Sequence, residues 1–248
     1  MLIGISGKKG AGKDAVGKII QWLNSDYYKN NVSPKNPLDN NMVDIKSPYQ
    51  IKKFANKLKD IVCLLIGCTK EQLENKKFKE TPLGKEWWNI FKPEVNFFAP
   101  YTDKNWETGD YLKYFKKNIV KTTPRLLLQN IGTQGMRKTV HNDIWVNALF
   151  ADYIATNVKS YIDKFGEEEI VDMDLPNWII TDVRFPNEAK AIKDRGGIVI
   201  RVNRNSDIID NHLSETALDN FKNFDYVIDN NGDISSLIEK IKQLNLVQ

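Results

Sequence analysis

The first residues of the chain join an apolar strand pattern to an apolar helix pattern. Residues 2–5 are a continuous apolar run, which is typical of a buried β-strand. After a glycine-rich stretch, apolar side chains recur at helical spacing at Val16, Ile19, Ile20 and Leu23. The same patterns predict a second strand over residues 50–54 and a helix over 55–66 that ends at Gly67.

Strands and helices also alternate in the C-terminal third of the chain. The patterns predict strands at 178–181, 198–202 and 226–228, and helices at 186–194, 213–221 and 234–244. Between the two ends they predict a helix over 124–131, a long helix from Asp143 through Phe165, and a solvated acidic loop over 167–174. Near-continuous apolar strands alternating with helices favour an α/β fold with a parallel sheet covered on both faces.

Two stretches interrupt this alternation. Residues 29–41 are polar and rich in Asn and Pro, which predicts an exposed loop or insertion. Residues 84–118 are unusually aromatic, at a spacing that fits neither a helix nor a strand throughout. These aromatic side chains are expected to form the small core of a helical insert or lid, with base stacking as the alternative. We predict one domain over 1–248, with its core in 1–28, 49–66 and 175–248 and a helical insert in 67–174.

Composition and charge narrow the classes of function. The net charge of +4 suits small phosphorylated substrates and gives no case for a nucleic-acid surface. The longest apolar run, residues 61–66, is too short to span a membrane, and since the first strand is predicted at residues 2–5 we expect no signal peptide. The two cysteines lie five positions apart in an apolar helix pattern and indicate buried thiols in a reducing compartment, and with only two histidines in the sequence a structural zinc site is not expected. We therefore expect a cytoplasmic protein that acts on small molecules.

The glycine-rich stretch after the first strand has the Gly-x4-Gly-Lys spacing of a phosphate-binding P-loop. Gly7, Gly10 and Gly12 would let the backbone curl so that successive N–H groups point at phosphate oxygens. The following helix would present its positive end to the same anion, and Lys13 would reach the β- and γ-phosphates. The alternative is a glycine-rich turn without a ligand, but the strand before the loop and the helix after it favour the P-loop.

One position departs from the usual P-loop. The lysine is normally followed by Ser or Thr, whose hydroxyl holds Mg²⁺. Here Asp14 and Ala15 follow, so neither position offers a hydroxyl. A carboxylate can bind Mg²⁺ directly or through water, and an Asp at a helix start is also favoured by the helix dipole alone. Both interpretations of Asp14 stay open at this point.

A second candidate lies where the strand over 178–181 ends. Asp182 and Arg184 follow that strand and precede a helix that begins at Pro186. Ligands of open α/β sheets bind at the carboxyl ends of the strands, so both side chains would lie beside the P-loop. Asp182 could hold Mg²⁺ or orient the attacking oxygen, and Arg184 could neutralise charge on a transferring phosphoryl group. The alternative is an Asp that caps the next turn and an Arg paired with Glu188.

Two further basic stretches are candidates for phosphate contacts. Arg125 and Arg137 flank a Gly132–Thr133 turn in an otherwise helical pattern, and arginine suits the bidentate grip of a monophosphate. Surface salt bridges are the alternative for each. Arg201 and Arg204 end the strand over 198–202, in a loop that either closes over the nucleotide or is a plain connection. His212, just beyond that loop, is expected to cap or pack rather than to act as a base.

With these residues identified, the chain resembles the deoxynucleoside monophosphate kinases of bacteriophages, within the P-loop nucleoside monophosphate kinase fold. The resemblance spans most of the chain, as several blocks in the same order: Ser6 to Asp14, Lys53–Phe54–Ala55 with Leu58–Lys59, Pro124–Arg125 with Gln129, Gly132–Thr133 and Arg137, Asp143 with Trp145, Asp182 to Phe185 with Asn187–Glu188, and His212 with Ser214–Glu215. The family's loop looks like Gly-Lys-Asp, which accounts for Asp14. The family often has Thr at the next position, and Ala15 departs from it.

The resemblance implies a reversible transfer of the γ-phosphoryl group of ATP to a deoxynucleoside monophosphate, with ATP and Mg²⁺ as cofactors. It implies binding of the ATP phosphates by Gly7, Lys8, Gly10, Ala11, Gly12, Lys13 and Asp14, and Mg²⁺ contacts by Asp14 and Asp182. Lys13, Asp182, Arg184 and Arg137 would be catalytic. The acceptor would be bound by Lys53, Arg125, Gln129, Gly132, Thr133, Arg137, Trp145 and Glu188, most of them in the helical insert over 67–174.

The partners expected are small-molecule nucleotides, without nucleic acid or a membrane, and a homodimer is possible. If the protein is viral, it would act in the host cytoplasm. Two other functions are considered. One is a different P-loop kinase of small molecules, similar to phosphomevalonate or dephospho-coenzyme A kinases. The other is a nucleotide-binding switch, which the absence of an Asn-Lys-x-Asp guanine-binding sequence disfavours.

Overall fold

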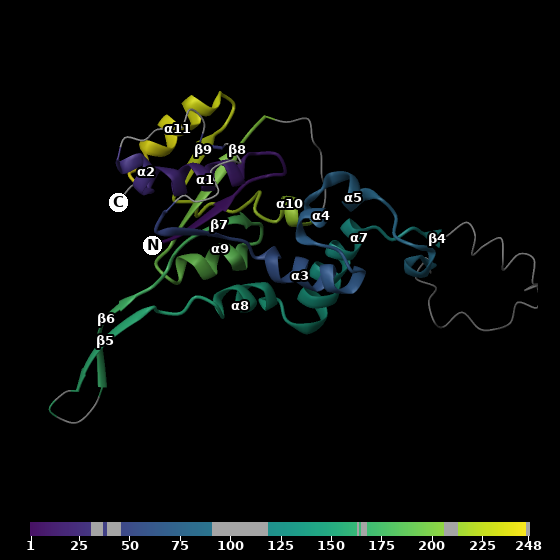
Figure 1. The fold of residues 1–248 in the computed structure, drawn as a ribbon, viewed down its shortest axis with the longest axis horizontal. Helices are drawn as coiled ribbons and strands as arrows, with labels where there is room; N and C mark the ends of the chain where they lie inside the picture. The colour runs from purple at the N-terminus through teal and green to yellow at the C-terminus, as the bar shows by residue number, and fades with distance from the viewer. Residues whose placement is uncertain are drawn as a thin grey trace, which may run out of the picture. The chain divides into compact units, whose positions relative to one another are not determined.

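The computed structural model describes residues 1–30, 37–38, 46–90, 119–162, 164, 168–205 and 213–246. It divides the chain into two units (Figure 1). Unit 1 consists of Met1–Lys57 and Asp143–Gln248, and unit 2 of Leu58–Asn142. The predicted insert over 67–174 and unit 2 differ in extent, and the assignment of acceptor binding to the insert stays a prediction.

A five-stranded sheet, in which all paired strands are parallel, forms the centre of unit 1. Its order is β2-β7-β1-β8-β9. The strands are β1 (Leu2–Ser6), β2 (Tyr49–Lys52), β7 (Asn177–Val183), β8 (Ile198–Asn203) and β9 (Tyr226–Asp229). The central strand β1 is buried along its whole length, and its Ile3 lies opposite Ile179 of β7 and Ile198 of β8. The predicted parallel α/β sheet is therefore confirmed.

Helices cover both faces of this sheet, and the alternation of side chains along β1 explains which helix meets which face. Ile3 and Ile5 point into an apolar cluster with α1 (Lys13–Leu23) and α11 (Ile234–Lys242). Gly4 faces the opposite side of the sheet, where Ile192 of α9 (Pro186–Lys193) packs so close that a Cβ atom would lie 2.6 Å from its Cδ1. Figure 1 shows α1 with α11 on one side of the sheet and α9 on the other. Two short helices, α2 (Asp26–Lys29) and α8 (Ile144–Phe150), complete this layer structure.

The order of the strands places the P-loop at a switch point of the sheet. The chain leaves β1 through α1 and reaches β2 on one side of β1, whereas it leaves β8 and reaches β9 on the other side. Ligands of open α/β sheets bind at such points, outside the carboxyl ends of the strands. The loop from Gly7 to Gly12 follows β1 at this end of the sheet.

Unit 2 is mainly helical. It contains most of α3 (Ala55–Ile66), followed by α4 (Lys70–Glu74), α5 (Lys76–Glu80), η1 (Lys85–Trp87), the short strands β3 (Asn89–Ile90) and β4 (Ile119–Val120), α7 (Pro124–Gln129) and the π-helical segment η2 (Asn130–Val140). A capping box begins α4: Thr69 accepts from the backbone N–H of Gln72, and the Gln72 side chain accepts from the N–H of Thr69. Lys59 pairs with Glu74, and this pair ties α3 to α4.

The prediction of a long helix from Asp143 through Phe165 is wrong, and so is the prediction of a loop over 167–174. Helix α8 ends at Phe150, and an antiparallel hairpin follows, made of β5 (Asn157–Ile162) and β6 (Glu168–Asp174). β-Branched residues explain the difference: Val158 and Ile162 in one strand and Ile170 and Val171 in the other favour extended backbone. The acidic residues between them concealed this strand pattern.

Two other elements differ from their predictions. The expected turn at Gly132–Thr133 is instead part of η2, which continues directly from α7. The helix expected over 213–221 is shorter, since α10 covers only Leu213–Thr216 and a turn follows it. Asp219 and Asn220 lie in that turn, and both residue types compete with helical hydrogen bonds through their side chains. The aromatic residues of 91–118, most of the Asn-rich loop and His212 lie outside the described residues.

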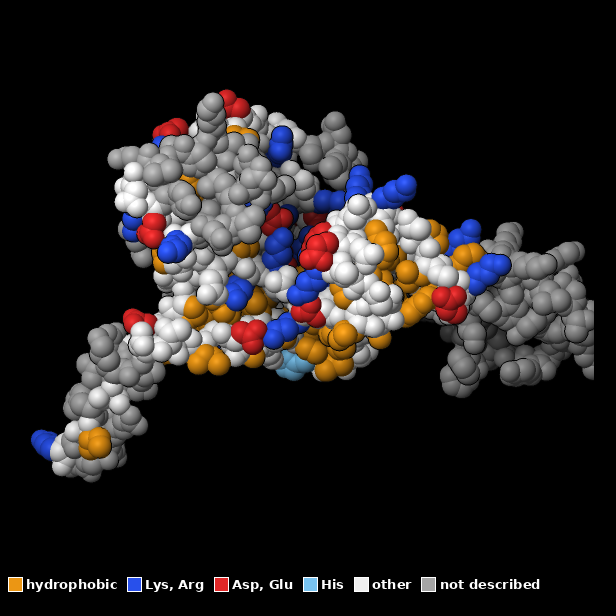
Figure 2. Space-filling view, in the orientation of Figure 1, with side chains coloured by type: hydrophobic (Ala, Val, Ile, Leu, Met, Phe, Trp, Pro, Cys, Tyr) orange, Lys and Arg blue, Asp and Glu red, His pale blue; other side chains and the backbone are white. Residues whose placement is uncertain are grey.

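The surface of the described residues bears both signs of charge. On the face that Figure 2 shows, Lys and Arg side chains are interspersed with Asp and Glu instead of forming one basic patch. Within the described ranges, the search for a helix long and apolar enough to cross a membrane gives none.

Candidate active site

The backbone of the P-loop is fixed from a distant part of the chain. Gly10 and Gly12 have positive φ angles of 81° and 96°, which glycine adopts without strain. Asn230, just after β9, donates from Nδ2 to the carbonyl oxygen of Ala11 at 2.9 Å. A Cβ atom on Gly12 would lie 2.4 Å from this same Nδ2. The loop therefore needs glycine at position 12 both for its conformation and for the close approach of Asn230.

Lys13 begins α1 and folds back over the loop. Its Nζ donates to the carbonyl oxygens of Gly7 at 2.7 Å and Lys8 at 2.9 Å. Burial and the nearby Arg184 lower the pKa of Lys13 to about 8, although Glu215 and Asp14 act in the opposite direction. An ammonium ion held in this way lacks a full counter-charge, so it favours an anion such as a phosphate.

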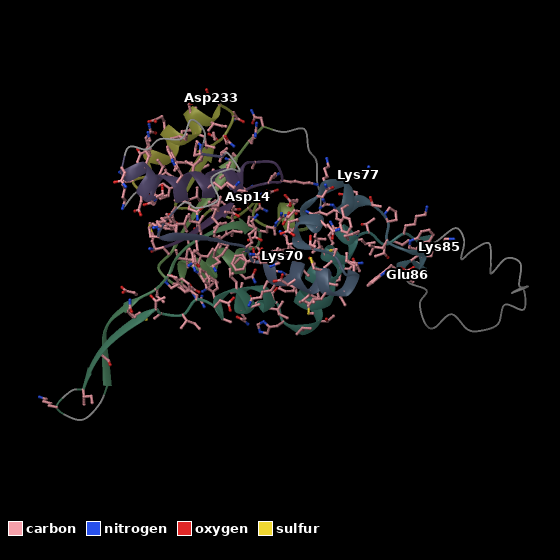
Figure 3. All side chains as sticks on the ribbon, viewed as in Figure 1. Asp14, Lys70, Lys77, Lys85, Glu86 and Asp233 are labelled. Atoms are coloured by element: carbon pink, nitrogen blue, oxygen red, sulfur yellow. The ribbon has the colours of Figure 1, made fainter. Side chains whose placement is uncertain are left out.

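Asp14 is the next residue of α1 and is labelled in Figure 3. Its Oδ1 accepts from the hydroxyl of Thr181 at 2.6 Å and lies 2.8 Å from Nζ of Lys53. Burial by itself raises the pKa of a carboxyl, but the hydrogen bonds from Lys53 and Thr181 outweigh it and bring the pKa of Asp14 below its usual value. Its Oδ2 has no hydrogen bond or ion pair with the residues that the structure describes. Asp14 thus offers one oriented, ionised oxygen.

Asp182 is fully engaged with the backbone. Its Oδ1 accepts from the N–H of Phe54 at 2.8 Å and its Oδ2 from the N–H of Ala55 at 3.0 Å. The side chain is largely buried and caps the first N–H groups of α3. The geometry resembles the alternative of a capping Asp, although the capped helix is α3 and not the next one along the chain. It favours a positioning role over metal binding.

Arg184 directly follows β7, and both its backbone N–H and its guanidinium have hydrogen-bond partners. Glu188 accepts from the backbone N–H of Arg184 at 2.7 Å and of Phe185 at 3.1 Å, and this buried carboxylate caps the start of α9. The guanidinium pairs instead with Glu215 and lies 3.3 Å from Oγ of Ser214, both through Nη1. Glu188 therefore contacts the backbone of Arg184, which differs from the side-chain pair considered from the sequence.

Residues on and just after α10 bind both the P-loop and two arginines. Glu215 accepts from the backbone N–H of Lys9 at 2.7 Å, in addition to its ion pair with Arg184. Asp219 lies 3.3 Å from Nζ of Lys8 and 3.4 Å from Arg201. Arg201 also donates to Oγ of Ser6, at the end of β1, over 3.2 Å. Arg201 thus serves the loop through its neighbours, and the described contacts assign it no separate role in closure over a nucleotide.

Three residues of this arrangement were not predicted as site residues. Thr181, Asn230 and Glu215 act through contacts across 167, 219 and 206 positions of sequence, respectively. Glu215 stood in a block of the family resemblance without an assigned role, and Thr181 and Asn230 each lie at or just after the carboxyl end of a predicted strand. Such ends meet at one edge of a parallel sheet, which is where the P-loop lies.

The predicted acceptor residues fall in both units. In unit 2, Arg125 of α7 pairs with Glu80, and Gly132 lies so close to Leu58 that a Cβ atom would be 2.7 Å from its Cδ2. Arg137, largely buried, points Nη1 toward the carbonyl oxygen of Asn142 at 3.5 Å. Gln129 and Thr133 lie on the same continuous helical stretch. In unit 1, Trp145 of α8 is 6% exposed.

Among the described residues, no group of three or more His, Cys, Asp or Glu side chains could hold a metal ion. Mg²⁺ in phosphoryl-transfer sites usually takes one or two carboxylates and completes its shell with phosphate oxygens and water. Asp14, with its oriented and ionised oxygen, fits that requirement next to the phosphate loop.

Comparison with known proteins assigns a family to most of these elements. Residues 93–241 match the family model described as deoxynucleotide monophosphate kinase. A deoxynucleoside-5'-monophosphate kinase of Escherichia phage T5 is 24% identical over 217 residues, which cover 78% of this chain and 72% of that protein. A putative deoxynucleotide monophosphate kinase of Acanthamoeba polyphaga mimivirus is 31% identical over 122 residues, or 48% of this chain and 59% of its own length. The family match includes Arg125, Asp182 and Arg184 but begins after the P-loop, so the phosphate-binding assignment rests on the geometry above.

Proposed function

The chain belongs to the deoxynucleotide monophosphate kinase family, and we propose that it transfers the γ-phosphoryl group of ATP to a deoxynucleoside monophosphate. The products are ADP and the deoxynucleoside diphosphate. The observation that supports this most directly is the arrangement of Lys13, Asp14 and Arg184 around the P-loop, at the switch point of a parallel sheet. This constellation supplies cations and an oriented carboxylate where a triphosphate would bind.

The P-loop forms the ATP side of the proposed site. The backbone N–H groups of the loop surround the β- and γ-phosphates, and Lys13 moves its Nζ from the loop carbonyls to the phosphate oxygens. The residues involved are Gly7, Lys8, Gly10, Ala11, Gly12, Lys13 and Asp14. The lowered pKa of Lys13 makes the gain of an anionic partner more favourable, because the free protein leaves the ammonium ion partly uncompensated.

Asp14 is the proposed ligand of Mg²⁺, directly or through one water molecule. Thr181 and Lys53 occupy its Oδ1 and leave Oδ2 for the metal side. Mg²⁺ held there would supply positive charge against the negative charge that develops on the phosphates during transfer. Thr181 thereby provides, from β7, a hydroxyl next to the loop that the residues after Lys13 lack. The second predicted ligand, Asp182, uses both oxygens to cap α3, and we assign it the positioning of that helix.

Arg184 is the proposed stabiliser of the transferring phosphoryl group. Among the described residues, only Nη1 of its guanidinium has partners, and Nε and Nη2 can donate to a phosphate. Phosphoryl transfer needs little covalent help, so positioning and charge neutralisation account for most of the catalysis. No general base is assigned, because a phosphate acceptor at neutral pH is already ionised.

Arg125 and Arg137 are the proposed acceptor residues of unit 2, together with Gln129, Gly132 and Thr133. Arginine binds a monophosphate through two parallel hydrogen bonds, and Arg125 is already paired with a carboxylate, Glu80, that an acceptor phosphate could replace. The proposed roles of Lys53, Trp145 and Glu188 in acceptor binding have less support. Lys53 pairs with Asp14, Trp145 is buried, and Glu188 caps the start of α9.

The experiment that tests this function is a scan of acceptors with Mg·ATP. ADP release is measured with each common deoxynucleoside monophosphate, each ribonucleoside monophosphate, phosphomevalonate and dephospho-coenzyme A. The expected result is turnover with one or more deoxynucleoside monophosphates and none with the last two compounds. Turnover with only phosphomevalonate or dephospho-coenzyme A, or ATP hydrolysis independent of any acceptor, would contradict the proposal.

A further inference from the structure

Glu215 joins two parts of the proposed active site that are far apart in the sequence. Its Oε2 accepts from the backbone N–H of Lys9, inside the P-loop, at 2.7 Å. Its Oε1 forms an ion pair with Nη1 of Arg184, just beyond the end of β7. The carboxylate is only 7% exposed. A buried carboxylate is tolerated when its oxygens are paired, and here a backbone donor and a guanidinium provide the pairing.

Among the residues that the structure describes, Arg184 is otherwise held only through its backbone and a hydroxyl. Glu188 fixes its N–H, and Oγ of Ser214 lies 3.3 Å from the same Nη1 that Glu215 binds. An arginine side chain has several rotatable bonds, so a fixed backbone leaves the guanidinium free to move. The contact with Glu215 sets its place relative to the P-loop, while Nε and Nη2 keep their donors for another partner.

The charges of the site make this contact more than a packing detail. Lys13 and Arg184 are two cations close enough for Arg184 to lower the pKa of Lys13, and Glu215 has the opposite effect. In a protein without a bound triphosphate, repulsion between the cations would push the flexible guanidinium away from the loop. The Glu215 carboxylate lies between a loop donor and the guanidinium and opposes that movement.

We propose that Glu215 is a positioning residue for phosphoryl transfer, which holds the guanidinium of Arg184 against the P-loop at Lys9. This role rests on the kinase activity proposed above. It places Glu215 outside direct contact with the nucleotide: its effect on the reaction passes through Arg184. The effect of Glu215 on the rate should therefore depend on Arg184, and the loss of Arg184 should make Glu215 of little consequence for the rate.

A cycle of four proteins tests this coupling: wild type, Glu215→Gln, Arg184→Ala and the double variant. Gln keeps the size of the side chain and one acceptor oxygen, but loses the charge and places an NH₂ group against one of the two donors. We expect Glu215→Gln to lower kcat roughly 10- to 100-fold, the range expected for loss of a hydrogen bond to a charged group. In the Arg184→Ala background the same change should cost less than about 2-fold, since non-additivity marks residues that act together.

Binding of ATP, measured directly by equilibrium titration, distinguishes a positioning residue from one that blocks a phosphate-binding donor. We expect Kd for ATP to change less than about 3-fold in Glu215→Gln, because the effect is on the transferring group and not on ground-state binding. Markedly tighter ATP binding would overturn the proposal, since Glu215 would then block a donor that a phosphate needs. Equal fold losses of kcat in both backgrounds would also overturn it, because Glu215 would then act independently of Arg184.

Two further variants guard against a purely structural effect. Glu239→Gln, in an exposed pair with Lys242 on α11, is the matched control and should leave kcat and the thermal midpoint unchanged. Ser214→Ala removes the second side-chain contact of the Arg184 guanidinium among the described residues, and it should lower kcat less than Glu215→Gln. If Glu215→Gln does not fold, the same cycle is run with Glu215→Asp, which keeps the charge but shortens the side chain, and an additive loss there overturns the proposal. An inactive wild-type protein would instead refute the proposed function itself.

Discussion

Replacing Thr181 by valine should weaken the binding of the divalent metal without disturbing the fold. Valine has the shape of threonine, so the methyl group that packs close to Gly17 is retained and only the hydroxyl is lost. That hydroxyl donates to Oδ1 of Asp14 at 2.6 Å, and Thr181 is only 1% exposed. The substitution therefore removes one of the two contacts that orient the proposed metal ligand.

The expected magnitude follows from this contact. A hydrogen bond to a charged group contributes about 1.5–3 kcal/mol, and the lower end applies because Asp14 keeps its contact with Lys53 and is partly exposed to water. About 1.5 kcal/mol corresponds to a roughly 10-fold rise in the metal concentration at half-maximal rate. Thr181→Ser keeps the hydroxyl and is the matched control, and it should stay close to the wild type in metal dependence.

The assay measures turnover against Mg²⁺ concentration at saturating nucleotide, together with direct titration of Mn²⁺ into the protein bound to ADP. Both readouts should shift in the same direction for Thr181→Val and return toward the wild type for Thr181→Ser. Thermal unfolding of each variant checks that the core is intact. A wild-type metal dependence in Thr181→Val would refute the orientation of Asp14 by Thr181, and so would equal impairment of both variants.

Two other predictions concern Lys13 and Asp182. Burial and Arg184 lower the pKa of Lys13 to about 8, and a bound phosphate would raise it. ATP affinity should therefore be constant below pH 8 and fall as the pH rises through 8. Lys13→Met should show no such fall in a binding titration. Without ATP, the free energy of unfolding should instead rise with pH between about 8 and 10.5, the pKa values of Lys13 in the folded and unfolded states, since the charged form is disfavoured only in the folded state. Asp182→Asn should destabilise the protein by about 1–3 kcal/mol in urea unfolding, because its NH₂ group would face a backbone N–H at the start of α3. Asp233→Asn is its control and should be nearly neutral, since Asp233 caps α11 through a single N–H at 2.8 Å and Asn caps equally well.

The sequence contained most of the sheet and the P-loop, but not the contacts that hold the loop. The strands of unit 1 are continuous apolar runs, and such runs are readable because both faces of a parallel sheet are buried. The hairpin of β5 and β6 escaped prediction because its acidic residues break the apolar pattern of its β-branched residues. The turn expected at Gly132 is absent because the π-helical segment continues through this glycine, which lies close to Leu58.

The sequence predicted the location of the candidate site better than the contacts of its individual residues. Asp182 was recognised as a strand-end carboxylate, but nothing local indicated that both oxygens bind the backbone of Phe54 and Ala55. Glu188 was predicted to bind the substrate, and its carboxylate also caps the start of α9. In each case a charged residue near the phosphate loop has backbone partners that only the three-dimensional structure reveals. The same limit explains why Thr181 and Glu215 were not predicted as site residues.

Transfer of labelled phosphate by a lysine-matched pair of variants tests the central claim most directly. Wild type, Lys13→Met and Lys18→Met are incubated with Mg²⁺, γ-³²P-labelled ATP and a deoxynucleoside monophosphate that the acceptor scan has identified. Lys18 lies on the same helix one turn beyond the loop, so its replacement controls for the loss of a lysine from α1. Labelled deoxynucleoside diphosphate should form with wild type and with Lys18→Met, and none should form with folded Lys13→Met. Wild-type formation of the labelled diphosphate by Lys13→Met would contradict it.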